Sequence, residues 1–124
     1  MREGGALLRK VTDNLTAHAM PGVTLKELDA LAEKLLKKTG GTPAFLGYKP
    51  AWAKKPYGAS ICASVNEVIG HGLPGAYALK EGDVVKLDLG LLYKGWYTDV
   101  AVTVPIGIVS DESQRLIAVT RDAL

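Results

Sequence analysis

The stretch VVKLDLGLLYKGWYTDVAVTV, residues 84–104, decides the fold. Its two parts, 84–93 and 96–104, are rich in β-branched and aromatic residues, as β-strands are. Only Lys94-Gly95 separates them, and a two-residue connection that contains glycine is typical of a tight antiparallel turn. The stretch therefore predicts a β-hairpin.

Two aspartates lie on this hairpin. A two-residue turn places Asp88 opposite Ala101 and Asp99 opposite Gly90. Both carboxylates then share one face as diagonal neighbours, with Cα atoms roughly 7 to 8 Å apart, and Gly90 leaves space between them. Hard divalent cations take oxygen ligands at about 2 Å, so the two carboxylates could hold one ion or part of a pair of ions. The spacing permits a metal site.

The same alternation has a simpler interpretation, in which one set of residues forms the solvated face of the hairpin: Lys86, Asp88, Gly90, Asp99, Ala101 and Thr103. A β-bulge beside the turn would also move one aspartate to the opposite face, because side chains alternate along a strand. From the pattern alone, both interpretations stay open.

Two helices are predicted before the hairpin. Apolar residues at helical spacing over roughly the first twenty positions indicate an amphipathic helix that stops at Pro21-Gly22. Thr24 and Glu27 have the spacing of a capping box, and a second apolar stripe runs from there to Gly40-Gly41. Residues 42–58 contain prolines, glycines and aromatic residues without periodicity, which predicts a long irregular segment.

The remaining segments complete an α+β pattern. Residues 60–65 alternate as a strand does, and Ser110-Asp111-Glu112 resembles a helix start. We expect four inward positions on that last helix: Leu116, Ile117, Val119 and Ala123. The order of elements predicts helices that cover one face of a mostly antiparallel sheet, in a single domain over 1–124. No stop signal follows the last helix, so we expect a truncated chain.

Composition restricts the class of protein. The chain has 124 residues, of which 48% are hydrophobic and 23% charged, and a net charge of +2. This charge does not demand nucleic acid or a membrane as a partner. The apolar runs are far shorter than the roughly 20 residues that span a bilayer. A lone cysteine, Cys62, and no signal-peptide pattern predict a soluble, cytoplasmic protein.

Two further residues are candidates for a site. His71 lies between glycines in Gly70–Gly75, which exposes the imidazole, and it could serve an active site or be an ordinary loop histidine. Cys62 lies on a predicted strand among small and apolar residues, which favours a buried structural thiol over a nucleophile.

Three linked motifs carry a resemblance to a known family. They are residues 60–74 (SICASVNEVIGHGLP), 79–90 (LKEGDVVKLDLG) and 93–99 (YKGWYTD). Together with 21–24 and 43–48 they resemble the methionine aminopeptidases over essentially the whole chain. The resemblance implies an N-terminal half of the pita-bread (creatinase/aminopeptidase) fold, in which two similar α/β halves hold a metal pair between them.

The resemblance also implies roles for single residues. Asp88 would be a ligand of one metal and Asp99 the carboxylate that bridges both, while His71 would contact the substrate and stabilise the tetrahedral intermediate. Phe45, Tyr57 and Cys62 would line the pocket for the methionine side chain. The cofactors implied are two divalent ions of Co, Mn, Fe or Zn, of which this chain could form at most a partial site.

The implied activity is that of a methionyl aminopeptidase, a metal-dependent hydrolase that removes N-terminal methionine from nascent proteins. The family's remaining ligands, one histidine and two glutamates, come from a second half that this sequence lacks. A further departure is the segment Lys49–Lys55, which is longer than the family's usual connection at the pocket rim.

Three alternatives follow for the functional form. A complementing C-terminal half could complete the site, or two copies could pair as a homodimer. A non-catalytic module could instead bind protein, ribosome or RNA, with a basic aromatic patch at Trp52, Lys54, Lys55 and Tyr57. We expect N-terminal methionine peptides as partners, and neither membrane nor DNA.

Overall fold

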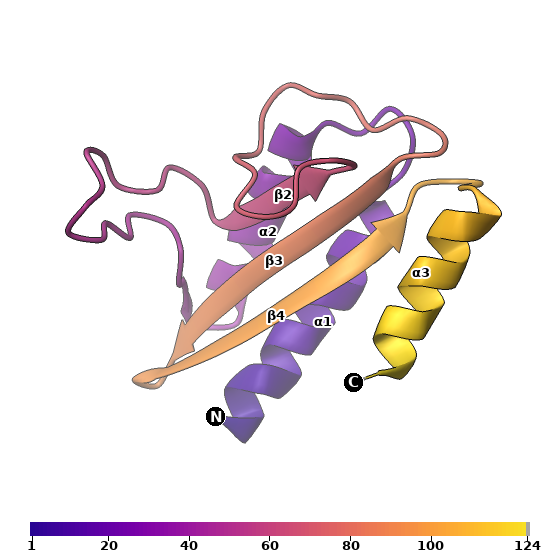
Figure 1. The fold of residues 1–124 in the computed structure, drawn as a ribbon. Helices are drawn as coiled ribbons and strands as arrows, with labels where there is room; N and C mark the ends of the chain where they lie inside the picture. The colour runs from indigo at the N-terminus through magenta and orange to yellow at the C-terminus, as the bar shows by residue number, and fades with distance from the viewer. Residues whose placement is uncertain (124) are drawn as a thin grey trace.

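The computed structural model describes residues 1–123, which form three helices and a four-stranded sheet (Figure 1). In chain order the elements are α1 (Arg2–His18), α2 (Leu25–Lys38), β1 (Thr42–Pro43), β2 (Ile61–Val65), β3 (Val84–Tyr93), β4 (Trp96–Pro105) and α3 (Asp111–Asp122). Figure 1 shows α1 and α2 on one side of the sheet and α3 beside β4. No helix in the described part of the chain is long and apolar enough to cross a membrane.

The sheet is antiparallel, with β3 at its centre. β4 pairs along the full length of β3 on one side, while β2 and β1 pair with different parts of its other side. The predicted register is confirmed, because Asp88 is opposite Ala101 and Gly90 is opposite Asp99. Lys94 and Gly95 form the turn with φ angles of 50° and 81°. These left-handed values belong to a type I′ turn, which follows the twist of the strands.

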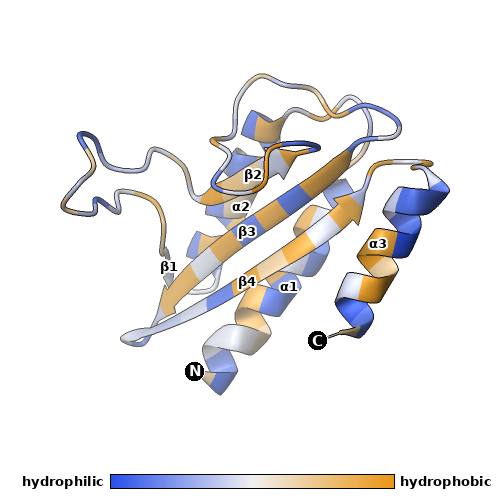
Figure 2. Cartoon of the chain, viewed as in Figure 1, coloured by the Kyte–Doolittle hydropathy of each residue, from blue (hydrophilic) through white to orange (hydrophobic). Residues whose placement is uncertain are grey.

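The helix-covered face of the sheet forms the core. Every second side chain of β3, at positions 85, 87, 89 and 91, is 0% exposed, because side chains alternate between the two faces of a strand. Figure 2 shows this alternation as hydrophobic and hydrophilic bands along β3. The helices contribute an apolar stripe each, which includes Leu8, Val11, Leu15, Leu28, Ala32 and Leu36.

Both predicted N-terminal helices are confirmed. The capping box at the start of α2 is complete, since Thr24 Oγ1 accepts a hydrogen bond from Glu27 N at 3.2 Å and Glu27 Oε2 accepts one from Thr24 N at 2.8 Å. The predicted strand over 60–65 is observed as β2, from Ile61 to Val65.

The prediction that 42–58 is irregular throughout is wrong at its start. Thr42 and Pro43 form β1 and lie opposite Leu92 and Leu91. Gly41 permits this approach, because a Cβ atom there would lie 2.6 Å from the Leu92 carbonyl oxygen. Two residues that pair with a distant strand leave no periodic pattern for the sequence to reveal.

The last helix begins where predicted, but most of the residues expected on its inward face are exposed. Ser110 caps α3 by accepting a hydrogen bond from Ser113 N at 3.2 Å. Leu116, Val119 and Ala123 are nevertheless exposed, and α3 buries no residue completely. The prediction of these three as inward positions is wrong, because α3 stands beside β4 instead of covering a face of the sheet. Ile117 alone of the four is half-buried.

Candidate functional site

The face of the sheet opposite α1 and α2 carries the predicted site residues, and we call it the open face. Asp88 points there because its neighbours Leu87 and Leu89 are in the core. Cys62 is its cross-strand partner on β2, and Asp99 lies diagonally across the hairpin on β4. The structure therefore brings the two predicted carboxylates to one face, as the register required.

Asp88 and Asp99 are like charges on one face, and neither forms an ion pair with a described residue. Asp88 is half-buried and Asp99 is exposed. Burial, and then the nearby charge of Asp99, raise the pKa of Asp88, while the charge of His71 acts in the opposite direction. Neither carboxylate accepts a hydrogen bond from any described residue. A cation is the chemical group that would relieve this repulsion.

The ligand set on this face is nevertheless incomplete. Over residues 1–123, no group of three or more His, Cys, Asp or Glu side chains is placed to hold a metal ion. Asp88 and Asp99 therefore supply at most two carboxylate ligands, whereas divalent cations with oxygen ligands take about six. A functional metal centre would need ligands from outside the described chain.

Gly90 fixes the space beside the carboxylates. A Cβ atom at this position would lie 2.9 Å from Ala44 Cβ, 3.0 Å from Phe45 Cε1 and 3.5 Å from Asp99 Oδ1. Ala44 N also donates a hydrogen bond to the Gly90 carbonyl at 3.0 Å. The absence of a side chain thus lets the Phe45 ring approach the sheet beside Asp99, which places this predicted pocket residue at the site.

His71 is held next to the same face by its own loop. Its φ angle of 55° lies in the left-handed region. The following residue, Gly72, accepts a hydrogen bond from Ala63 N at 2.9 Å and donates one to Ser64 Oγ at 3.0 Å. A side chain at Gly72 would collide with the Ala63 carbonyl. The loop is thereby anchored to β2, and the exposed imidazole lies close enough for its charge to act on Asp88.

Tyr57 is half-buried and lies against Cys62, which is buried. Tyr57 Oη donates to the carbonyl oxygens of Ile61 at 3.0 Å and Gly72 at 3.3 Å. Burial is the largest cause that raises the pKa of the Cys62 thiol, and the charges of Asp88 and Asp99 raise it further. Cys62 therefore stays protonated, in agreement with the predicted buried thiol. Burial and the contact with Cys62 also raise the pKa of Tyr57.

Asp29, which supports the start of β2, was not predicted from the sequence. Asp29 on α2 accepts hydrogen bonds from Ser60 N at 2.8 Å and Ile61 N at 3.1 Å, and so holds the start of β2. Burial is the largest effect on its pKa, which it raises. Its sequence signal was present, because Asp29 lies four residues after Leu25 and three before Ala32, within the apolar stripe of the helix.

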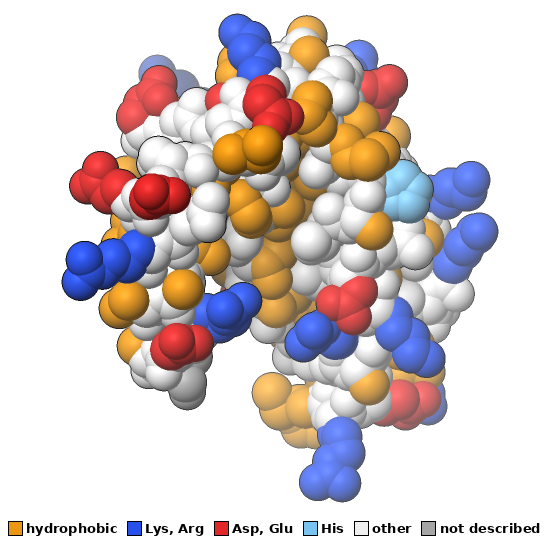
Figure 3. Space-filling view, turned by 90° about the vertical axis from the view of Figure 1, so that its right-hand side faces the viewer, with side chains coloured by type: hydrophobic (Ala, Val, Ile, Leu, Met, Phe, Trp, Pro, Cys, Tyr) orange, Lys and Arg blue, Asp and Glu red, His pale blue; other side chains and the backbone are white. Residues whose placement is uncertain are grey.

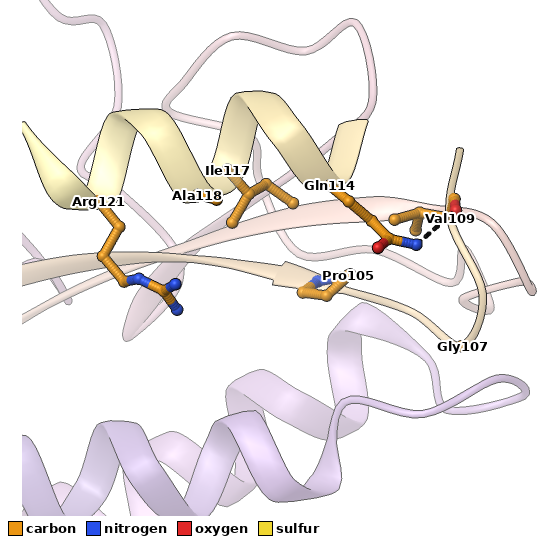
Figure 4. Close-up of a pocket in the computed structure, with 7 residues that line it drawn as sticks. All are labelled: Pro105, Gly107, Val109, Gln114, Ile117, Ala118 and Arg121. Carbon is orange, nitrogen blue, oxygen red and sulfur yellow. Dashed lines mark hydrogen bonds between the residues drawn. The ribbon is translucent and has the colours of Figure 1, made fainter. Parts of the chain in front are cut away.

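Two cavities lie away from the carboxylates. One of about 450 Å³ lies beside the loop that carries His71, between β2 and the start of α2, and includes Leu25, Ala63, Leu73 and Tyr77. The other, of about 220 Å³, lies between the end of β4 and α3 (Figure 4). Figure 3 shows that this side of the molecule is hollowed, with hydrophobic side chains along the hollow. Neither cavity contains Asp88 or Asp99.

Comparison with known proteins agrees with this arrangement. The chain matches the family model of Metallopeptidase family M24 over residues 1–124. Methionine aminopeptidase 1 of Bacillus subtilis is 40% identical to it over 124 residues, which is 100% of this chain and 48% of that protein. The chain thus spans about half the length of the curated relatives it matches.

Solved structures show the same likeness. The methionine aminopeptidase of Thermotoga maritima matches with a TM-score of 0.92 and 34% identity, over 100% of this chain and 48% of that one. That of Rickettsia prowazekii matches with a TM-score of 0.91 and 36% identity, over 98% of this chain and 47% of that one. The expected α+β fold, matching half of a pita-bread structure, is thereby confirmed. The chain belongs to metallopeptidase family M24 and is similar over its whole length to part of the methionine aminopeptidases.

Proposed function

We propose that the protein, in its functional form, removes N-terminal methionine from nascent proteins by metal-dependent hydrolysis. The observation that carries the proposal is the pair Asp88 and Asp99, two carboxylates on one face that form neither a hydrogen bond nor an ion pair with any described residue. The likeness to methionine aminopeptidases gives the substrate class. A cytoplasmic location suits both this substrate and a free, buried cysteine.

In this proposal Asp88 and Asp99 hold the divalent ions, which when bound lower the pKa of a water molecule and polarise the scissile carbonyl. His71 contacts the substrate and donates a hydrogen bond to the carbonyl oxygen as negative charge develops on it. Its glycine-flanked loop, anchored to β2, fixes the imidazole at the edge of the open face.

The pocket for the methionine side chain would be formed by Phe45, Tyr57 and Cys62. The Phe45 ring lies over Gly90, and the Tyr57 hydroxyl already donates to the backbone, so the wall that faces a ligand is largely apolar. A thioether is apolar and polarisable and packs favourably against aromatic rings and sulfur. A charged or amide side chain would lose its hydration in this pocket without a partner.

The remaining ligands must come from another segment, and we propose that residues 1–124 act as one domain with a complementing C-terminal half. The similarity to proteins about twice as long and the apolar hollow beside α3 both support this arrangement. A homodimer is the other way to complete the site and cover the hollow. Light scattering of the isolated chain distinguishes them, since a monomer at micromolar concentration excludes the stable homodimer.

Calorimetric titration with Mn²⁺ or Co²⁺ tests the metal site in the chain alone. We expect weak binding by the unmodified chain and loss of the heat in Asp88→Asn and in Asp99→Asn. Asp122→Asn is the matched control, because this exposed carboxylate lies on α3. Equal heats in all four proteins would remove the proposed metal site.

A further inference from the structure

The segment between the pocket residues Phe45 and Tyr57 forms a projecting arm, which we define as residues 48–56. Two backbone hydrogen bonds close its base, from Gly47 N to Tyr57 O at 2.9 Å and from Tyr57 N to Tyr48 O at 2.8 Å. Figure 1 shows the arm extending away from the sheet, on the side opposite α3. The arm is thus a defined extension of the molecule that contributes little to the core.

The arm carries an isolated positive charge. Lys49, Lys54 and Lys55 are all exposed, and the sequence has no aspartate or glutamate between Glu33 and Glu67. None of the three lysines forms an ion pair with another described residue. The net charge of the whole chain is only +2, so the three lysines of the arm exceed it. An anionic partner would meet no opposing charge on the arm.

Aromatic rings accompany these lysines. Trp52 is 86% exposed and Tyr48 is 63% exposed. Ala53 N donates to the Pro50 carbonyl at 3.0 Å, and Trp52 lies within this turn in the middle of the arm. An exposed tryptophan contributes almost no hydrophobic stabilisation to the fold. Its flat face is therefore free to stack on a planar ligand.

We propose that the arm binds an unpaired strand of nucleic acid. Lysines that neutralise phosphates and aromatic side chains that stack on bases are the two components of sequence-tolerant single-strand binding. A duplex hides its bases from Trp52, and the carboxylate side chains of an acidic peptide carry no ring to stack on it. A single strand offers a phosphate and an unpaired base at every nucleotide. The inference uses no residue of the proposed metal site, so it does not depend on the proposed peptidase activity.

Fluorescence anisotropy with a labelled oligouridine of about fifteen nucleotides tests this binding. We expect binding that weakens with salt, with a slope of log K against log [salt] of roughly −2, since about 0.7 counterion is released per phosphate contact. The triple variant Lys49→Gln, Lys54→Gln, Lys55→Gln should bind roughly tenfold or more weakly. A second triple variant, Lys10→Gln, Lys34→Gln, Lys38→Gln, removes the same charge from exposed helix positions and should bind as the unmodified chain does.

Stacking is tested separately at Trp52. Trp52→Ala should weaken binding about five- to hundredfold, whereas Trp52→Phe should retain most of it. The chain has two tryptophans, so in Trp96→Phe the fluorescence comes from Trp52 and should be quenched by the oligonucleotide. A thymidine DNA strand of the same length, used as a second probe, identifies whether RNA is preferred.

Three results would overturn the proposal. They are an equal loss of affinity in the two triple variants, binding of an RNA duplex as tight as that of the single strand, and unchanged Trp52 fluorescence at saturating oligonucleotide. Circular dichroism of each variant shows that the fold is retained, so a loss of binding cannot be ascribed to unfolding.

Discussion

The two faces of the sheet carry different side chains, although the same strands form both faces. The side chains are apolar on the helix-covered face and mainly polar on the open face. On the face covered by α1 and α2, the β3 side chains are leucine and valine and are 0% exposed. On the open face, the same strand presents Lys86, Asp88 and Gly90. The alternation along β3 therefore supplies stability on one side and places Asp88 on the other, where it shares the face with Asp99 of β4. Substitutions on the two faces should have different costs.

The largest difference is expected between a core residue and an open-face residue of the same hairpin. Leu89→Ala should lower the free energy of unfolding by about 2–5 kcal/mol, because it leaves a cavity in the core. Thr103→Ala on the open face should change it by less than about 0.5 kcal/mol. Urea denaturation measures both, and similar losses would contradict the division between the faces.

Gly90 should be the exception on the open face. Gly90→Ala brings a methyl group within 2.9 Å of Ala44 Cβ and 3.0 Å of Phe45 Cε1, and should cost about 1–3 kcal/mol by overpacking. Gly5→Ala is the matched control, since no described atom outside the adjacent turns of α1 lies within 4 Å of the new methyl group. This control should gain roughly 0.5–1 kcal/mol from helix propensity. A stable Gly90→Ala protein would show that Phe45 does not pack there.

Asp83, directly before β3, differs from Asp88 within the strand because it has hydrogen-bond partners. Asp83 is 6% exposed and accepts hydrogen bonds at 2.9 Å each from Asn66 Nδ2, Tyr77 Oη and Lys80 N. Burial alone would raise its pKa, but these bonds lower the pKa overall. Its contribution to stability is therefore complete above the unfolded pKa of about 3.9 and is lost as the pH falls through the lowered folded value.

Asp83→Asn should thus lower the free energy of unfolding at pH 7 by about 1–3 kcal/mol, because it removes a charged acceptor from a buried network. The difference from the unmodified chain should shrink as the pH falls below about 3.9. Urea denaturation at pH 7, 4 and 3 measures this change. An equal loss at all three pH values would contradict the assignment.

Asp88→Asn should have the smallest effect and the opposite sign. Burial and the charge of Asp99 raise the folded pKa of Asp88, so ionisation opposes folding in the absence of metal. The variant should be slightly more stable than the unmodified chain at pH 7, and the gain should vanish below the unfolded pKa of about 3.9. Metal-free thermal unfolding at both pH values checks the sign. A loss at pH 7 would mean that Asp88 has a stabilising partner.

The sequence predicts the local parts of this structure well. The hairpin and its register follow from the Lys94-Gly95 turn and from strand alternation, and the cap of α2 follows from Thr24 and Glu27. These features depend on residues close together in the chain. The shared face of Asp88 and Asp99 could be predicted for the same reason.

Features set by distant segments could not be predicted. The exposed face of α3 depends on where the helix lies relative to β4, and its own periodicity does not specify this. The packing of Phe45 over Gly90 depends on how the segment from 42 onward returns across the sheet. Asp29 could have been noticed as a polar residue in an apolar stripe, but its partners Ser60 and Ile61 could not.

Paramagnetic broadening by Mn²⁺ in a nitrogen-15 NMR spectrum of the chain tests the central claim most directly. If Asp88 and Asp99 hold the ion, substoichiometric Mn²⁺ should broaden the amide signals of Cys62, Gly90 and Asp99 first, ahead of those of α1 on the opposite side of the sheet. The same addition to Asp88→Asn should leave all these signals sharp. Broadening centred on another acidic region, or none at the open face, would contradict the account.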